Sequence, residues 1–381
     1  MLQASDHTSE GHVPANDTFH IAVMPGDGIG IEVMRPCLAV LDAAAIRVGG
    51  FRLAFDQLEA GALCYRDTGV ALPKASLAAA RTADAILLGA MGWPEIRYAD
   101  GTEISPQIDL RIEFGLYAGI RPIKTLPSML PTLADKRGAV LDFVIIREST
   151  EGLFSSRGKG TVVDNREARD TMVVTRDVCE RLFDSAFLLA RSRKQKGGKG
   201  IVTCVDKANV FASFAFFRKI FDERAALHPD IKANHAYIDA TALFMVRKPW
   251  EFDVLVTENM FGDILSDLGA GLIGGMGFAP SADIGDSHAV FQPCHGTAPD
   301  IAGQDKANPT AMFLSAAMML EWLGAKHDRL QAVAAGQLIR NAVDTAFGAG
   351  IRPFEIGGRD GTANITQRVL EALKTVEPVA A

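Results

Sequence analysis

The stretch that decides the fold is Phe252-Asp253-Val254-Leu255-Val256-Thr257-Glu258-Asn259-Met260-Phe261-Gly262-Asp263-Ile264-Leu265-Ser266-Asp267-Leu268. It predicts a buried strand, a tight turn and then a helix. Asp263 and Asp267 are four residues apart, so a helix places them on one face, one turn from each other. Two carboxylates this close repel each other unless a cation or a basic group lies between them. Because hard oxygen ligands suit Mg²⁺ or Mn²⁺, the pair is a candidate metal site; an ordinary solvated helix face is the alternative.

The length and composition indicate a folded enzyme-sized chain. Its 381 residues exceed one typical domain, so we expect two lobes. A hydrophobic content of 48% and a charged content of 22% are typical of a folded soluble protein. The net charge of −7 argues against nucleic acid or an anionic membrane as a partner. No apolar run is long enough to span a bilayer.

The cysteines and the N-terminal segment bear on the compartment. The five cysteines are scattered without CxxC spacing, which argues against a disulfide framework or a zinc site and predicts a reducing, cytoplasmic location. Residues 1–18 are polar and lack the apolar core of a signal peptide. We expect them to form a disordered tail.

Strand and helix signals alternate along the chain. Short apolar runs predict strands at residues 20–24, 85–88, 143–146, 201–204, 236–238 and 253–256. Most of them are followed by helical stretches, and this βαβ rhythm predicts an α/β architecture with a largely parallel sheet. Residues 154–175 differ, because they are rich in Gly, Arg, Asp and Thr and end in a β-prone run. We interpret them as a protruding arm that contacts another subunit.

The glycines at 26, 28 and 30 follow the first predicted strand. Their spacing is not the GxGxxG of a standard dinucleotide-binding loop. A tight strand-to-helix turn is the better interpretation, since glycine tolerates the backbone angles that such a turn requires.

Three arginines form a basic group: Arg111, Arg121, which precedes a proline, and Arg147, which directly follows a predicted strand. Arginine prefers planar, two-point contact with carboxylates. Together the three fit a substrate with two or more carboxylates, although each alone could form a structural ion pair.

Two further segments carry chemistry. Lys207 follows a predicted strand, where a lysine near a cation or other basic groups can act as a proton carrier; an ordinary surface lysine is the alternative. Asp239 ends another strand and could be a third metal ligand. Residues 293–303 and 306–309 form a Gly- and Pro-rich loop with polar side chains that is suited to wrapping a nucleotide.

The motifs FGDILSDL, VDKANV, PGDGIG, HGTAPDIAG and ANP, taken in combination, resemble those of the metal-dependent β-decarboxylating dehydrogenases, from about His20 to the C-terminus. This family acts on isopropylmalate, isocitrate, homoisocitrate, tartrate or D-malate. The resemblance implies an α/β fold of its own, distinct from the Rossmann fold, and a homodimer with active sites shared between subunits. It implies a first, nucleotide-binding lobe of residues 19–116 plus 274–381, and a second lobe of residues 117–273 with its dimer arm near 154–175.

The resemblance also implies roles for individual residues. Arg111, Arg121 and Arg147 would bind substrate carboxylates, with Ser105 and Gln107 nearby. Asp263 and Asp267 of one subunit and Asp239 of the other would bind Mg²⁺ or Mn²⁺, and Lys207 would transfer a proton across the interface. The nucleotide-binding residues would be His295, Gly296, Thr297, Ala298, Asp300, Ile301 and Asn308. Because an acid at Asp300 would repel a 2′-phosphate, we expect NAD as the cofactor and not NADP.

Three positions depart from the family pattern. Phe154 stands where the family has a tyrosine that helps to protonate the enol, and a phenyl ring has no proton to donate. Gln107 and Ile108 stand where isopropylmalate enzymes have leucines, so the lining is more polar than an isopropyl group requires. Gln292 replaces a common glutamate near the nicotinamide loop.

We therefore expect an NAD-dependent, divalent-metal-dependent dehydrogenase of a 3-substituted malate-type dicarboxylic acid, similar to the 3-isopropylmalate enzymes. One alternative is a tartrate or D-malate dehydrogenase, which Gly92-Trp93-Pro94 also resembles. A second is oxidation without decarboxylation, because of Phe154. A third is a regulatory subunit with low activity.

Overall fold

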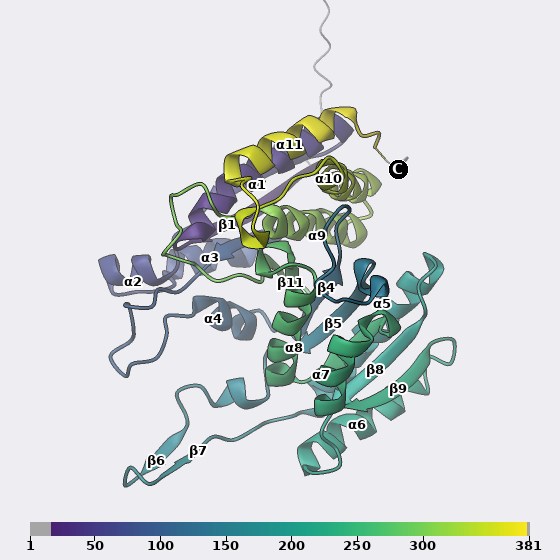
Figure 1. Cartoon of the computed structure of the whole chain (residues 1–381). Coiled ribbons are helices and arrows are strands. Elements are labelled where there is room, and N and C mark those ends of the chain that lie inside the picture. Colours follow the sequence, from purple (N-terminus) through teal and green to yellow (C-terminus); the bar gives the residue numbers. More distant parts are fainter. Residues whose placement is uncertain (1–16, 379–381) are drawn as a thin grey trace, which may run out of the picture.

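The computed structural model describes residues 17–378 (Figure 1). Its strands are β1 (Thr18–Gly26), β2 (Arg52–Gln57), β3 (Ala85–Ala90), β4 (Ala118–Lys124), β5 (Asp142–Glu148), β6 (Thr161–Val163), β7 (Glu167–Arg169), β8 (Ile201–Asp206), β9 (Lys232–Tyr237), β10 (Val254–Thr257), β11 (Pro280–Ile284) and β12 (Ala289–Pro293). Its α-helices are α1 (Ile29–Val48), α2 (Ala62–Thr68), α3 (Lys74–Thr82), α4 (Pro106–Glu113), α5 (Arg176–Gln195), α6 (Ala212–Ala225), α7 (Ile238–Arg247), α8 (Asn259–Leu272), α9 (Thr310–Lys326), α10 (Leu330–Gly348) and α11 (Thr362–Thr375). Within this range, every helix is too short or too polar to cross a membrane.

Ten of these strands form one sheet, in the order β2-β1-β3-β12-β11-β4-β5-β10-β8-β9. Pairing is parallel within β2-β1-β3-β12 and within β5-β10-β8-β9. Between them, β11 and β4 are antiparallel to both of their neighbours. The sheet thus has two parallel halves that run in opposite directions. This confirms the predicted α/β architecture with a largely parallel sheet.

Helices cover both faces of the sheet, and the apolar residues of the strands alternate between them. In β1, Ile21 and Val23 pack in the cluster that includes α1, α9, α10 and α11, whereas Ala22 and Met24 pack on the opposite side with α3 and α4. The residues of β5 alternate in the same way, between α8 on one face and α5 and α6 on the other. Strands buried on both faces explain the continuous apolar runs in the sequence.

A small hairpin stands apart from this sheet. Strands β6 and β7 pair antiparallel with each other, and Figure 1 shows them extending away from the rest of the chain. The hairpin lies inside residues 154–175, where the sequence predicts a protruding arm. The β-prone run at its end, residues 171–175, makes only an isolated bridge between Val173 and Gly152.

The predicted lobe boundaries fall in loops, just before β4 and just after α8. Strands β4 and β11 lie on opposite sides of that division and are hydrogen-bonded neighbours, so the sheet is continuous across it. The two-lobe assignment stays a prediction. Of the predicted tail, residues 1–16 lie outside the described residues, and Thr18 already begins β1.

The glycine turn between β1 and α1 is held by one buried carboxylate. Asp27 accepts hydrogen bonds from the backbone N–H groups of Ala62 at 2.7 Å, Leu63 at 2.8 Å and Gly92 at 2.9 Å. Gly28 adopts a φ of 52°, and a Cβ at this position would lie 2.2 Å from the Thr297 carbonyl oxygen. The glycines form a tight turn between β1 and α1, as their spacing predicts, and the structure shows in addition that this turn packs against three other segments.

Replacing Asp27 by alanine should destabilise the fold. Three buried N–H groups would lose their acceptor, and such losses cost about 1–3 kcal/mol each, so we expect the free energy of unfolding to fall by about 3 kcal/mol or more. Urea unfolding followed by tryptophan fluorescence measures it. Asp67→Ala is the control, because this exposed carboxylate bonds only to Arg66. Equal urea midpoints for the two variants would contradict the assignment.

Candidate active site

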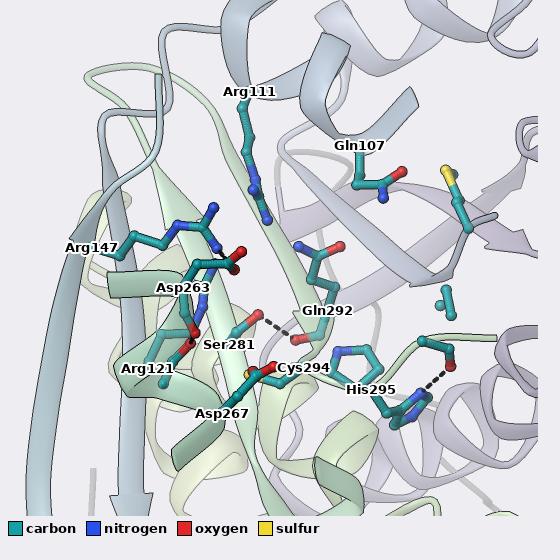
Figure 2. Close-up of a pocket in the computed structure, with 16 residues that line it drawn as sticks. Gln107, Arg111, Arg121, Arg147, Asp263, Asp267, Ser281, Gln292, Cys294 and His295 are labelled. Atoms are coloured by element: carbon teal, nitrogen blue, oxygen red, sulfur yellow. Dashed lines mark hydrogen bonds and ion pairs between the residues drawn. The ribbon is translucent and has the colours of Figure 1, made fainter. Parts of the chain in front are cut away.

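A polar cavity of about 170 Å³ brings together residues from distant parts of the chain. It is lined by Gly89, Ala90, Met91, Gln107, Arg111, Arg121, Arg147, Asp263, Ser266, Asp267, Ser281, Gln292, Pro293, Cys294, His295 and Gly296. Figure 2 shows Arg111 reaching from α4 into the space between Arg147 and Gln292, with the aspartates of α8 below. The three arginines and two aspartates singled out in the sequence thus lie around one cavity.

Helix α8 places its two aspartates at the cavity because its start is fixed. The buried Glu258 caps the helix by accepting hydrogen bonds from the N–H groups of Met260 at 3.1 Å and Phe261 at 2.7 Å. Asp263 and Asp267 then follow one turn apart on the face that lines the cavity. Burial and the neighbouring charge of Asp263 raise the pKa of Asp267. This is the electrostatic signature of two carboxylates that share one site.

Arg147, at the end of β5, is nearly fully buried and held by helix α8. Its Nε and Nη2 donate to Asn259 Oδ1 at 2.9 Å and 2.7 Å, and its Nη1 pairs with Asp263. The Arg147 guanidinium also stacks on the Phe154 ring, 5.0 Å from the ring centre. Burial and the charge of Arg111 lower the pKa of Arg147 to about 10, which leaves it protonated at neutral pH.

The other two arginines share one carboxylate that the sequence reasoning missed. Asp283 on β11 is fully buried, and it accepts from Arg111 Nε at 3.1 Å and Arg121 Nη2 at 2.9 Å. It also accepts from Ser149 Oγ and Gln292 Nε2, both at 3.1 Å. Burial would raise the pKa of Asp283, but the charges of Arg111 and Arg121 outweigh it and lower that pKa well below the usual range. A charged residue inside an apolar strand was the available signal.

The predicted lining near the C3 side of the substrate is only partly at the cavity. Gln107 lines it, and its Oε1 is buried with no hydrogen-bond partner among the described residues. Ser105 does not line it: this residue is buried beside the start of α4, and its hydroxyl donates to the Glu103 carbonyl at 3.3 Å. An unpaired buried amide oxygen is costly, so Gln107 is poised to accept a hydrogen bond from a ligand.

Lys207 and Asp239 lie away from this cavity. They pair with each other beside the end of β8 and the start of α7, and the Asp239 side chain is largely exposed. The hydrogen bond from Lys207 lowers the pKa of Asp239. Within residues 17–378 there is no group of three His, Cys, Asp or Glu side chains placed to hold a metal ion. In one copy of the chain, therefore, the α8 aspartates and Asp239 are not joined.

The predicted nucleotide loop borders a second cavity, of about 330 Å³. It is lined by Ile29, Gly277, His295, Ala298, Ile301, Lys306, Ala307, Asn308, Phe354 and Glu355. Of the other predicted loop residues, Gly296 lines the first cavity, Thr297 is buried and Asp300 is exposed. His295 borders both cavities. Burial lowers the pKa of His295, and its buried Nε2 has no hydrogen-bond partner in the described part of the chain.

The loop is fastened to α1. The N–H of Ile29 donates to the Thr297 carbonyl at 2.8 Å, and the N–H of Gly303 donates to Glu32 Oε2 at 2.7 Å. These bonds hold the loop against the start of the first helix, next to the glycine turn. The result is a mostly apolar cavity with a few polar lining groups, which suits an aromatic ring system.

Comparison with known proteins agrees with this geometry. The family described as Isocitrate/isopropylmalate dehydrogenase matches residues 20–373. The chain belongs to the isocitrate/isopropylmalate dehydrogenase family. It is 41% identical to a 3-isopropylmalate/3-methylmalate dehydrogenase of Methanocaldococcus jannaschii, over 93% of this chain and 98% of the relative. It is 38% identical to a 3-isopropylmalate dehydrogenase of Geobacillus kaustophilus, over 94% and 95%.

Solved structures of the family have the same fold. An isocitrate dehydrogenase from Methylococcus capsulatus aligns with a TM-score of 0.81 at 34% identity, over 93% of this chain and 99% of that one. A β-decarboxylating dehydrogenase from Thermococcus kodakarensis aligns with a TM-score of 0.75 at 35% identity, over 94% and 96%. The protein is therefore an oxidoreductase of the β-decarboxylating dehydrogenase class, which acts on a CH–OH group.

Arg147→Lys should impair this dehydrogenase activity strongly. An ammonium group cannot reproduce the planar contacts to Asn259 and Asp263, so the positive charge at the cavity would be displaced, and such a displacement can cost about 100-fold in kcat/KM. Steady-state kinetics measures the fall. The control is Arg193→Lys, the same exchange in an arginine that pairs with Asp253 and Asp142 away from the cavity. A comparable small loss in both variants would contradict a role at the site.

Proposed function

We propose that the protein oxidises and decarboxylates a malate-type 2-hydroxy dicarboxylic acid, using NAD⁺ and Mg²⁺ or Mn²⁺. The observation that carries this proposal is the cavity itself, where three arginines face two aspartates and the nucleotide loop forms the adjoining wall. Guanidinium groups are suited to carboxylates, and paired carboxylates are suited to a hard divalent cation. The names of the relatives, 3-isopropylmalate dehydrogenases, support the same substrate class.

The residues fit a divalent cation. Asp263 and Asp267 present carboxylate oxygens to the cavity from consecutive turns of α8, and burial together with the charge of Asp263 raises the pKa of Asp267. One chain offers these two carboxylates, and Asp239 of a second copy would supply a third ligand. Mg²⁺ accepts such a site because it keeps several waters in its coordination shell.

The loop at residues 295–308 fits a dinucleotide. The apolar walls of its cavity suit an adenine ring, and the unpartnered Nε2 of His295 offers a polar contact between the two cavities. Asp300 is exposed in the loop between Ala298 and Ile301, which line this cavity, and an acid there favours ribose hydroxyls and repels a 2′-phosphate. These features support NAD over NADP.

The residues of the chain position the substrate and move its protons. When bound, the cation supplies a Lewis acid for the 2-hydroxyl and NAD⁺ supplies the hydride acceptor. The substrate loses a hydride from C2, the hydroxyl proton and CO₂ from C3, and it gains a proton at C3. Arg111 and Arg147 orient its carboxylates, which is mainly an effect of position. Lys207 of a second copy carries the proton at its Nζ.

This arrangement supports a homodimer. Helices α7 and α8 pack on each other and leave Leu243, Val246 and Ile264 exposed at 54%, 49% and 60%. Such apolar side chains on adjoining helices favour coverage by a second copy. Because Asp239 lies on α7 and Asp263 on α8, a dimer formed through these helices brings the two parts of the site together.

The C3 substituent separates two candidate substrates. The relatives support 3-isopropylmalate. The polar lining by Gln107 and Gln292 favours a smaller or hydroxyl-bearing group, as in D-malate or tartrate. Phe154 adds the question of how much CO₂ leaves, because its ring cannot protonate the enol.

The test is a turnover panel with purified protein, NAD⁺ and Mn²⁺. The substrates are 3-isopropylmalate, D-malate, tartrate and isocitrate, and both NADH and CO₂ are recorded. We expect turnover of a dicarboxylate, loss of activity on chelation of the metal, and one CO₂ per NADH. NADH formation well in excess of CO₂ would favour oxidation without decarboxylation. The absence of turnover with all four would favour the regulatory alternative.

Subunit complementation tests the shared site. Lys207→Met and Asp263→Asn should each abolish activity in the homodimer. After subunit exchange, half of the dimers carry one intact site, so activity should recover to about a quarter of the wild-type value. Recovery is measured by NADH formation after mixing, with each variant alone as the control. If Lys207 served the site of its own chain, mixing would restore nothing.

A further inference from the structure

Asp283 is placed at the centre of the arginine cluster without lining the cavity. Its side chain is completely buried on β11, and it accepts four hydrogen bonds, two of them from arginines on α4 and β4. The Gln292 amide donates one of the others and itself lines the cavity. A buried carboxylate with this many donors is ionised and rigidly held.

The hydrogen bonds of Arg111 and Arg121 show which of their nitrogen atoms are still available to a ligand. Arg111 donates to Asp283 through Nε alone, and in the described part of the chain its Nη1 and Nη2 have no partner. Arg121 is more fully occupied, because Nη1 donates to the carbonyls of Ile120 at 3.2 Å and Ala282 at 3.0 Å while Nη2 contacts Asp283. Asp283 therefore anchors Arg111 from behind and leaves its terminal nitrogens to bind a carboxylate.

The charges around the cavity can also be counted. Arg111, Arg121 and Arg147 carry three positive charges, and Asp283 cancels one. The two α8 aspartates balance the divalent cation proposed above. Lys207 and Asp239 form a neutral pair. Two positive charges then remain for the substrate, which matches a dicarboxylate.

We propose that Asp283 is a positioning residue and internal counter-charge, which aims Arg111 at the substrate and restricts the site to dicarboxylates whose C3 substituent is uncharged. The proposal rests on the proposed function and names its substrate class more narrowly. In isocitrate the carboxymethyl group on C3 adds a third carboxylate, which meets one positive charge too few. The Asp283 side chain thus has two separate effects: it orients Arg111, and it lowers the net positive charge at the cavity.

Equilibrium binding tests the charge effect without turnover. Succinate and tricarballylate differ by one carboxymethyl group, and neither has the 2-hydroxyl that is oxidised. Calorimetry on the full-length protein with Mn²⁺ gives their two dissociation constants. For Asp283→Asn we expect the preference for tricarballylate over succinate to rise about tenfold or more over wild type. In turnover, kcat/KM for isocitrate relative to the best dicarboxylate should rise in parallel, with KM for that dicarboxylate increasing as Arg111 loses its anchor.

Two further variants separate this role from stability. Asp253→Asn removes another buried carboxylate, which lies away from the cavity. Asp253 accepts hydrogen bonds from Arg193 Nε at 2.7 Å and from the N–H of Ile201 at 3.0 Å. It should lower the thermal unfolding temperature and leave the anion preference unchanged. The double variant Asp283→Asn with Gln292→Glu returns a carboxylate across the same 3.1 Å contact. It should restore the wild-type preference.

A folded Asp283→Asn protein whose preference between tricarballylate and succinate equals that of the wild type would overturn the proposal. If that variant does not fold, the double variant decides: the wild-type preference supports the proposal, and a shift toward tricarballylate overturns it. Wild-type protein that discriminates between the two anions but turns over none of the panel substrates would instead count against the proposed function.

Discussion

Like-charge repulsion among three buried guanidinium groups is the constraint on which the site depends. Arg111, Arg121 and Arg147 border a cavity of about 170 Å³, where the low dielectric makes each charge act strongly on the others. Burial and this repulsion together lower the pKa of Arg147. Fixed hydrogen-bond acceptors hold the arginines in place: Asp283 accepts from Arg111 and Arg121, and Asn259 accepts from Arg147.

The register of the central strands makes room for this network. Asp283 on β11 lies opposite Gly119 on β4, and Gly119 lies opposite Arg147 on β5. A Cβ on Gly119 would come within 2.6 Å of Ser149 Oγ and 2.9 Å of Asp283 Oδ1. The side chains of Asp283 and Ser149 occupy the space that the glycine leaves free. The antiparallel pairing of β4 with β11 at the middle of the sheet thus brings Arg121 into contact with Asp283.

Local patterns in the sequence predicted those features of the structure that depend only on residues close together in the chain. The spacing of Asp263 and Asp267 was enough to place both on one face of α8, and the glycine spacing was enough to predict a tight turn. The three arginines were grouped from the preference of guanidinium groups for carboxylates, and the family resemblance then gave their role; no local rule joins positions so far apart. The Asp283 contact to Arg111 spans 172 residues and depends on strand register, so the sequence could mark Asp283 as a charged residue but could not show its partners. Ser105 lies outside the cavity lining, where its hydroxyl donates to a carbonyl of its own turn, and its role stays a prediction.

The source of the proton at C3 links catalysis to assembly. Phe154 lies against Arg147 and offers no proton. Of the other groups at the cavity, burial raises the pKa of the Cys294 thiol and lowers that of His295, so the first is a weak acid and the second is neutral at physiological pH. Neither of these two groups is a good acid with a proton to give. In the function proposed above, Lys207 of a second copy, or water that it orders, is the donor. A separated subunit would keep its arginines and aspartates and would lack this donor.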